Sequence, residues 1–450
     1  MFCLSSGQPA SKKVADDLTR YVEAGEQAAE DFIQTRLVDK TVKFQDRMKK
    51  LSLHTFKSMA LKCSLTSAQK KTVEVRAERN LLGSLLGSLL MLSQHHNISL
   101  EQLFEFSLGP IPWSLASADD GLVKTDKAQL MHAVEAITEN SDNVTLEKTV
   151  NIMDGNALMQ SLTHLPQTFE DLAMSIFTCL PKSDTVHFVT DTYLENSIKQ
   201  LERARRGSAS AYIIGGRKTK LPHDFKTFLH NSENKRQLTC FLLKEWQTDR
   251  YAQRLQGRNV YFVLESQCIC LHSMDGLTVD ASPVPELSSN QEEADTRIIL
   301  HCLYSSQQMP TDVAVVVRSP DTDVFILLMA YSFEIQQPLM FDTGGGNNRR
   351  LLDVHKHAAA LGHDVACALP AFHAFTGSDC TSAFVRKGKK GPLKLLRNNH
   401  NAVQAFLEVG TQANSVSESA ALELEKFVCA MYGKPTFSNT DKVRYEIFTV

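Results

Sequence analysis

The sequence has little of what marks a secreted, membrane-embedded or strongly basic protein. Ten cysteines are scattered without a Cys-x-x-Cys pair, which argues against a disulfide framework or a zinc knuckle and favours a reducing compartment. The longest apolar stretch, residues 81–92, is well short of the ~20 residues that a membrane helix needs, and the N-terminus lacks the apolar segment of a secretory signal. With 48 Lys and Arg against 51 Asp and Glu, a nucleic acid would have to be bound by local patches. We therefore expect an intracellular protein that does not contact a membrane.

The 450 residues carry 43% hydrophobic and 22% charged side chains, the balance of an ordinary globular protein with about two to four domains. Residues 1–145 have the spacing of helices and show no obvious chemistry, so a docking module and a helical lid both remain open, with a protein partner unknown. From residue 146 short β-branched runs alternate with helical stretches, and helical patterns return after residue 400. This predicts a helical N-terminal region over 1–145, an α/β domain over 146–400 and a helical segment over 401–450.

Short apolar runs predict the strands of the α/β domain at 149–153, 185–190, 259–265, 312–319 and 338–341. Near-continuous apolar strands that alternate with helices are typical of a parallel twisted sheet covered on both faces. The sequence therefore predicts a three-layer α/β fold. The TGGGNN stretch at 343–348 falls between two short strands and predicts a hairpin turn.

Acidic residues follow three of these strands directly. Asp154 comes after the first strand, Asp191 after the second, and Asp321 and Asp323 after the fourth. Because ligands bind at the carboxyl ends of the strands in an open α/β sheet, we expect these carboxylates to gather there. Oxygen-only clusters suit hard cations such as Mg²⁺ or Mn²⁺. An Asp at a strand end is also a common turn former or helix cap, but three such strands together favour a metal site.

The order of the motifs resembles the flap-endonuclease-like, structure-specific 5′-nucleases of the PIN-like superfamily. The resemblance covers roughly residues 148–410 and leaves the first 145 unexplained. It is carried by a first strand-end Asp motif, a strand-end Asp followed by basic residues on a helix, a Glu-Ala-Glu-like motif, an Asp-x-Asp, and a Gly-x-Asp that precedes a helix-two-turn-helix. These are, in that order, MDGNALMQ (153–160), HFVTDTYLENSIKQLERARR (187–206), EEADT (292–296), SPDTDVFIL (319–327) and TGSDCTSAFVRKGKKGPLKLL (376–396).

The resemblance implies a PIN-like nuclease domain with helix-two-turn-helix-like and C-terminal helices after it. It also implies a divalent-metal-dependent nuclease, nuclear and acting on DNA or else on RNA, that hydrolyses phosphodiesters with two Mg²⁺ or Mn²⁺ ions. Lys199 and Arg206 match the basic residues that contact the scissile phosphate. The matching metal-site acids are Asp154, Asp191, Glu293, Asp295, Asp321, Asp323 and Asp379.

The sequence departs from the family pattern at three places. Arg386 stands where the first glycine of the hairpin is expected, and a turn that approaches phosphate through bare N–H groups prefers glycine. A 145-residue extension precedes the first strand. Residues 207–290 occupy the position of the family's helical arch, and the sequence does not decide whether they form one.

Two clusters of basic residues follow candidate metal acids along the chain. The first basic cluster follows Asp191 and contains Lys199, Arg203, Arg205 and Arg206. The second follows Asp379 and contains Arg386, Lys387, Lys389, Lys390 and Lys394. Charge runs are usually solvated faces, but a phosphate backbone that reaches the metals would have to pass these positions. We expect Lys199 and Arg206 to act on the transition state and the second cluster to hold more distant duplex phosphate. The predicted nucleic-acid contacts are Arg203, Arg205, Arg386, Lys387, Lys389, Lys390 and Lys394.

Two alternatives to a PIN-like nuclease stay open at this level. The first is a catalytically inactive nucleic-acid-binding or adaptor protein that retains the fold, which Arg386 and the long extension favour. The second is a transposon-derived nuclease of the RNase H type, which also joins acids at strand ends but normally needs only about three carboxylates. Whether the acids converge in one place distinguishes a metal site from scattered helix caps.

Overall fold

The computed structural model describes most of the chain beyond residue 146 and shorter segments before it. The chain divides into two compact units, Met1–Pro112 and Trp113–Val450, which are described separately. The described residues are 10–43, 54, 91, 99, 101, 124–138, 146–193, 210–411 and 415–449.

The described part of the first unit is helical. It contains α1 (Lys12–Thr19), α2 (Tyr21–Phe32) and a π-helical turn over Ile33–Val38, which agrees with the helix predicted there. Ser11 caps α1 by accepting a hydrogen bond from the Val14 amide. The apolar run at 81–92, except for Met91, lies outside the described residues.

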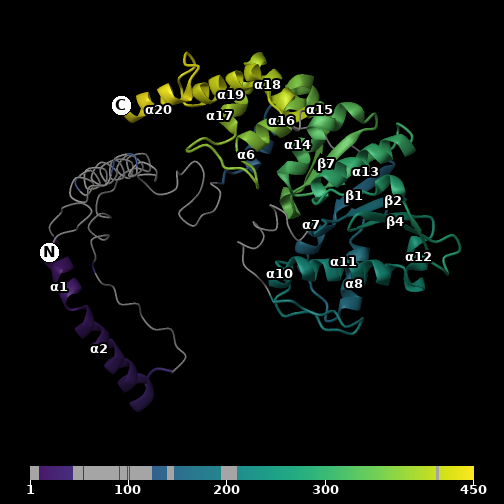
Figure 1. The fold of residues 1–450 in the computed structure, drawn as a ribbon. Helices are drawn as coiled ribbons and strands as arrows, with labels where there is room; N and C mark the ends of the chain where they lie inside the picture. Colours follow the sequence, from purple (N-terminus) through teal and green to yellow (C-terminus); the bar gives the residue numbers. More distant parts are fainter. Residues whose placement is uncertain are drawn as a thin grey trace. The chain divides into compact units, whose positions relative to one another are not determined.

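The second unit is built on an eight-stranded mixed sheet (Figure 1). The strand order is β5-β4-β3-β2-β1-β6-β7-β8, and the strands β3, β2, β1, β6 and β7 at its centre pair in parallel. The strands are β1 (Thr149–Asp154), β2 (Thr185–Val189), β3 (Asn259–Leu264), β4 (Gln267–His272), β5 (Asp280–Pro283), β6 (Ala314–Arg318), β7 (Leu339–Thr343) and β8 (Arg350–Asp353). All five predicted strands are confirmed.

The edges of the sheet differ from the all-parallel arrangement predicted. The pairs β3–β4, β4–β5 and β7–β8 are antiparallel, because short turns connect these strands and leave no room for the crossover helix that parallel pairing requires. The 343–348 stretch forms the predicted turn between β7 and β8, with a short 3₁₀ helix at Gly346–Asn348.

Helices cover both faces of the sheet. One core joins Val150, Ile152 and Val317 to α13, α14 and α16, and the other joins Met153 and Phe188 to α8 and α11. The first group of helices is α6 (Ala128–Glu135), α13 (Ala294–Gln308), α14 (Thr322–Tyr331), α15 (Val354–Leu361), α16 (His363–Phe375), α17 (Lys390–Arg397), α18 (His400–Thr411) and α19 (Glu418–Met431). The last helix, α20 (Thr440–Thr449), packs against α19. The second is α7 (Gly155–Gln160), α8 (Phe169–Thr178), α10 (Phe225–Phe228), α11 (Ser232–Trp246) and α12 (Ala252–Leu255).

The α/β unit extends beyond the boundaries predicted at 145 and 400. Leu130 and Val134 of α6 are fully buried in the first core, so this helix belongs to the α/β unit rather than to a separate N-terminal region. Phe406 and Phe427 place α18 and α19 in the same core. Apolar burial across the expected boundaries is the physical reason that one unit forms, since each of these helices covers its apolar side only by packing here.

Residues 210–290 contribute mainly to the core of this unit. Trp246 and Leu242 of α11 are fully buried against the sheet, and Trp246 Nε1 donates a hydrogen bond to the Ala173 carbonyl of α8. The part of the arch position that is described therefore forms α10, α11 and α12 and the strands β3, β4 and β5, of which β5 is the edge strand. Among the described residues, no helix has both the length and the hydropathy to cross a membrane.

Gly155 at the start of α7 allows the helix to approach β2 closely. A Cβ added at this position would lie 2.7 Å from Cζ of Phe188 and 2.9 Å from Cγ2 of Thr190, and both of these residues are fully buried. We expect Gly155→Ala to lower the free energy of unfolding by about 1–3 kcal/mol, because the rigid core cannot accept another methyl group without strain. Urea denaturation measures the change.

A matched control for this substitution is Gly391→Ala in α17, where an added Cβ meets nothing within 4 Å. It should leave stability unchanged or raise it by up to ~1 kcal/mol through helix propensity. Equal losses for the two variants would contradict the close approach of α7 to β2.

Candidate metal centre

The strand order reverses between β1 and β6, and the predicted acids cluster at this point. Strands to one side of β1 follow it in order as β2 and β3, whereas β6 and β7 lie on its other side. In an open α/β sheet the carboxyl ends at such a switch point form a crevice, because the connections leave in opposite directions. Asp154 is the last residue of β1, and two residues separate Asp321 from the end of β6.

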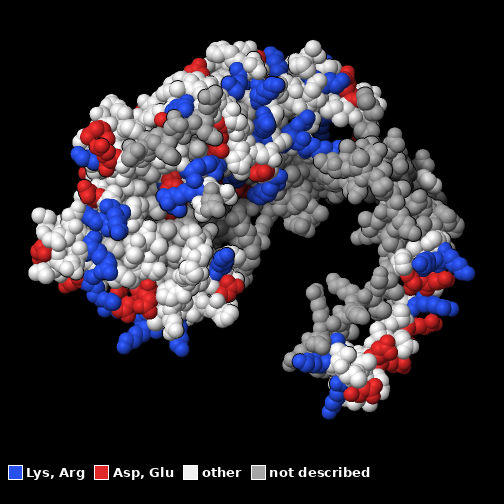
Figure 2. Space-filling model, turned by 180° about the vertical axis from the view of Figure 1, so that it is seen from behind, with Lys and Arg blue, Asp and Glu red and all other residues white. Residues whose placement is uncertain are grey.

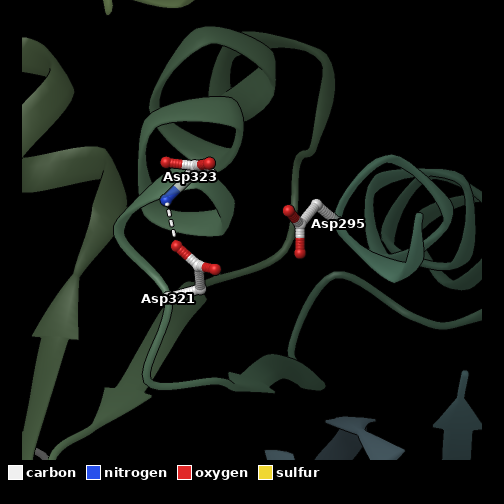
Figure 3. A group of neighbouring side chains, drawn as sticks. All are labelled: Asp295, Asp321 and Asp323. Atoms are coloured by element: carbon white, nitrogen blue, oxygen red, sulfur yellow. Dashed lines mark hydrogen bonds between the residues drawn. The ribbon is translucent and has the colours of Figure 1, made fainter. Parts of the chain in front are cut away.

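Three carboxylates meet within metal-binding distance. One oxygen each from Asp295, Asp321 and Asp323 lies within 4.8 Å of the others, and all three side chains are partly buried. Figure 3 shows Asp321 reaching the cluster from the turn before α14 and Asp323 from the first turn of that helix, with Asp295 facing them from α13. Asp321 caps α14, since its Oδ1 accepts the Asp323 backbone N–H at 2.9 Å. The cap fixes the position of both carboxylates.

The three carboxylates of the cluster are partly shielded from water and lie close to one another, so their negative charges are poorly solvated and repel. Burial, followed by the charges of Asp321 and Glu293, raises the pKa of Asp295 well above its ordinary value. Burial and the Asp323 carboxylate also raise the pKa of Asp321. Like charges that share a partly dry site favour protonation or the binding of a cation. A cation at this position would relieve the repulsion.

Asp154 lies beside the cluster at the carboxyl end of the central strand β1. Its Oδ1 accepts a hydrogen bond from the Ala157 amide at 2.9 Å, and its Oδ2 accepts one from Ser319 Oγ at 3.1 Å. The side chain is 8% exposed, and burial together with the charges of Asp191 and Asp321 raises the pKa of Asp154 to about 6. Ser319 also accepts the Asp321 amide at 3.1 Å, so one hydroxyl links the two strand-end acids.

Asp191 and Glu293 lie beside this cluster, where the loop after β2 meets the start of α13. Asp191 Oδ1 accepts the Ala294 amide at 2.9 Å, which ties the loop after β2 to the start of α13. Glu293 is the residue that precedes α13, and its charge acts on Asp295. The loop after β2 is held in place by Arg297, which is 1% exposed and donates to Thr192 Oγ1 at 3.1 Å.

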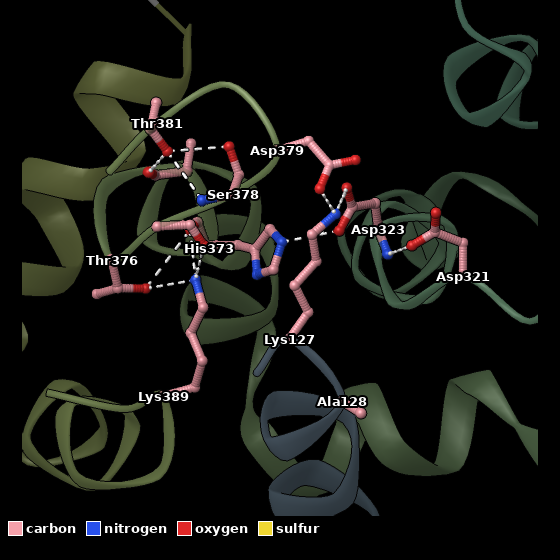
Figure 4. A network of polar contacts seen from close by, with 12 residues as sticks. Lys127, Ala128, Asp321, Asp323, His373, Thr376, Ser378, Asp379, Thr381 and Lys389 are labelled. Carbon is pink, nitrogen blue, oxygen red and sulfur yellow. Dashed lines mark hydrogen bonds and ion pairs between the residues drawn. The ribbon is translucent and has the colours of Figure 1, made fainter. Parts of the chain in front are cut away.

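Asp323 contacts two basic side chains, one through each carboxylate oxygen. Its Oδ1 lies 2.8 Å from His373 Nε2, and its Oδ2 accepts a hydrogen bond from Lys127 Nζ at 2.8 Å. Burial alone would raise the pKa of Asp323, but the His373 hydrogen bond and the Lys127 charge outweigh it and hold the pKa below the usual range. Lys127 also forms an ion pair with Asp379 Oδ1 at 2.6 Å, and Figure 4 shows its ammonium between the two carboxylates. Asp379 thus joins the cluster through Lys127.

The donor set fits a hard divalent cation. Three carboxylates in reach of one point supply only oxygen ligands, which Mg²⁺, Mn²⁺ and Ca²⁺ prefer. The ammonium of Lys127 shows that positive charge is already accommodated beside them. Although burial opposes it, the charge of Asp323 raises the pKa of Lys127 above its ordinary value. The structure supports a cation site here and leaves the identity of the ion open.

The second basic cluster is only partly available to a ligand. Arg386, Lys390 and Lys394 are exposed, and the Lys387 ammonium lies 4.7 Å from the centre of the Tyr432 ring. Arg386 adopts φ +58°, the left-handed conformation that glycine adopts most easily. The turn that the resemblance assigns to Gly-x-Gly therefore forms here with an arginine. Figure 2 shows Lys and Arg gathered toward the upper part of one face and mixed with Asp and Glu elsewhere.

The prediction that Lys389 contacts nucleic acid is wrong. Lys389 is fully buried, and its Nζ donates to the His373 carbonyl at 2.6 Å, to Thr376 Oγ1 at 2.8 Å and to the Gly377 carbonyl at 2.5 Å. Burial lowers the pKa of Lys389 to about 7. The side chain supports the loop that carries Asp379, so it is a positioning residue (Figure 4).

The first basic cluster lies outside the described residues. Lys199, Arg203, Arg205 and Arg206 fall within 194–209. The contacts of Lys199 and Arg206 with the scissile phosphate, and of Arg203 and Arg205 with nucleic acid, stay predictions.

Sequence reasoning missed Lys127 and His373. His373 lies six residues before Asp379 on α16, and this proximity to a candidate acid was an available signal. Lys127 had none, because 196 residues separate it from Asp323 and only the packing of α6 brings them together.

Comparisons with known proteins identify no relative of this chain. No protein-family model matches it, and no curated protein or solved structure matches it. The likeness to the flap-endonuclease-like family therefore rests on the motifs alone.

Proposed function

We propose that this protein is a divalent-metal-dependent nuclease with a PIN-like domain that hydrolyses phosphodiester bonds in DNA, or in RNA. The observation that carries the proposal is the convergence of Asp295, Asp321 and Asp323 at the switch point of the sheet. A bound Mg²⁺ or Mn²⁺ would activate water and stabilise the charge that develops on the phosphate. Such a site is in keeping with the five motifs that the chain shares with the family.

The surrounding residues support this role in distinct ways. Asp154 and Asp191 place two further acids at the same edge, where metal-bound waters need hydrogen-bond acceptors. His373 orients Asp323 through a 2.8 Å hydrogen bond, as partners of metal ligands commonly do. Asp154 and Asp191 lie beside the three carboxylates that meet, whereas an RNase H-like alternative normally needs only about three.

We assign the binding of phosphate at a distance from the metals to the second basic cluster, in the turn before α17 and in α17 itself. Arg386, Lys390 and Lys394 are exposed there, close in sequence to Asp379, and each neutralised phosphate would steepen the salt dependence of binding. Lys387 contributes less to such binding, because its ammonium already packs on Tyr432.

A catalytically inactive nucleic-acid-binding protein is the second candidate. The observation that favours it is the ion pair of Lys127 with Asp323 and Asp379, which neutralises part of the acid cluster without a metal. In that case Mn²⁺ should not raise the melting temperature, whereas a competent site is stabilised by the ion that it binds.

Cleavage of flap, single-stranded and duplex DNA and RNA by the purified full-length chain tests the proposal. Cleavage should require Mg²⁺ or Mn²⁺ and stop in EDTA. Asp321→Asn should lose it, and Asp312→Asn, which changes an exposed acid just before β6, should keep it. If wild type cuts none of these substrates, or Asp321→Asn cuts as well as wild type, the proposal is refuted.

A further inference from the structure

The acid cluster contains a cation supplied by the chain itself. Lys127 Nζ lies 2.8 Å from Asp323 Oδ2 and 2.6 Å from Asp379 Oδ1, and its side chain is 20% exposed. Figure 4 shows it pointing from the start of α6 into the gap between these two carboxylates. An ammonium at these distances occupies the place of a cation that would bridge the same oxygens.

The helix that carries Lys127 is firmly attached. Leu130 and Val134 are fully buried. At the other end of α6, Arg350 forms an ion pair with Glu135 at 2.8 Å, and Thr138 Oγ1 lies 2.7 Å from His357 Nδ1. The position of Lys127 is therefore built into the core of the α/β unit, which distinguishes it from a mobile lid.

A second ion could not share the two carboxylates with Lys127. A divalent ion binds oxygen at about 2.1 Å, so an ion on Asp323 Oδ2 would lie within about 5 Å of the ammonium. An ion that bridged Asp323 and Asp379 would therefore have to displace the Lys127 ammonium from the gap between them. Asp295, Asp321 and Asp323 still offer one oxygen each within 4.8 Å of one another. An ion held by these three acids leaves the Asp379 carboxylate to Lys127.

We propose that Lys127 takes the place of a second metal ion, so that the cluster binds one divalent cation at Asp295, Asp321 and Asp323. The proposal rests on the proposed metal-dependent function and replaces the two-ion stoichiometry that the family resemblance implies. In this arrangement Asp379 holds Lys127 through their ion pair, and Asp295, Asp321 and Asp323 hold the one divalent ion.

Counting bound Mn²⁺ on the full-length chain tests this, with free Mn²⁺ measured by electron paramagnetic resonance. Wild type should bind one ion and Lys127→Met two. Lys124→Met is the matched control: Lys124 donates to the Asp379 backbone carbonyl at 2.7 Å, and Lys127 stays in place in this variant, so it should bind one ion.

Asp379→Asn provides a second test that does not depend on the folding of Lys127→Met. Our proposal expects this variant to keep one bound ion, with a dissociation constant within about 3-fold of the wild-type value. Two ions in wild type, with one lost in Asp379→Asn, would overturn the role of Lys127 and leave the proposed nuclease function standing. If neither wild type nor Lys127→Met binds an ion, the metal-dependent function itself is refuted.

Discussion

Asp154→Asn is expected to make the metal-free protein more stable and metal-dependent cleavage slower. Asp154 is 8% exposed and its pKa is raised to about 6 from 3.8, so keeping the carboxylate ionised in the folded state costs free energy. The difference between these two pKa values corresponds to about 3 kcal/mol at neutral pH. Asparagine keeps an acceptor for the Ala157 amide and removes the charge. Loss of a metal-site acid should slow cleavage by at least about 100-fold.

The sign of the pH dependence follows from proton linkage. Below pH 3.8 the carboxyl is protonated in both the folded and the unfolded chain, and it costs no stability. As the pH rises to about 6, the unfolded chain releases its proton first and stability falls; above that it is constant. In EDTA the advantage of Asp154→Asn should therefore approach about 3 kcal/mol at neutral to mildly alkaline pH and fall below about 1 kcal/mol near pH 4. Urea denaturation at the two pH values measures it.

Asp312→Asn is the control, because Asp312 is exposed and should give a difference of less than about 0.5 kcal/mol at either pH. A destabilised Asp154→Asn with the same deficit at both pH values would show that Asp154 acts only as the cap of α7.

Lys389→Met should lower the free energy of unfolding by about 3 kcal/mol. The substitution keeps most of the side-chain volume but removes three hydrogen bonds, to the His373 and Gly377 carbonyls and to Thr376 Oγ1. Each buried acceptor left unpaired costs about 1–3 kcal/mol, and relief from burying the amine offsets part of the total. Urea denaturation again provides the measurement.

Lys390→Met is the neighbouring comparison. Lys390 is exposed at the first position of α17, so its loss should change stability by less than about 0.5 kcal/mol and flatten the salt dependence of nucleic-acid binding by up to ~0.9 for one lost phosphate contact. Equal stability for the two variants would contradict the supporting role of Lys389.

The strands and the acids at their ends could be predicted from sequence because both depend on local patterns. β1, β2, β3, β6 and β7 are short β-branched or apolar runs that a parallel sheet buries on both faces. Asp154 and Asp321 follow such strands directly, and the geometry of parallel strands brings their ends to one edge. The convergence of Asp295 with Asp321 and Asp323 was also anticipated, through the motif order.

The limits of the α/β unit were less accessible. The mixed edges of the sheet arise from turn lengths, and the inclusion of α6, α18 and α19 arises from burial of Leu130, Phe406 and Phe427 in one core. The sequence of an amphipathic helix predicts that its apolar face is buried, but it does not indicate which part of the protein covers that face.

The sequence by itself determined the central strands, the order of the acids and the oxygen-only character of the site, because periodicity and residue chemistry are local properties. Only the tertiary structure decided which charges meet. Lys127 and Lys389 are ordinary basic residues in the sequence, yet packing places one between Asp323 and Asp379 and the other in a dry site under the Asp379 loop. Contacts between residues 196 positions apart, such as Lys127 and Asp323, depend on how the whole core closes, and no local pattern encodes that closure.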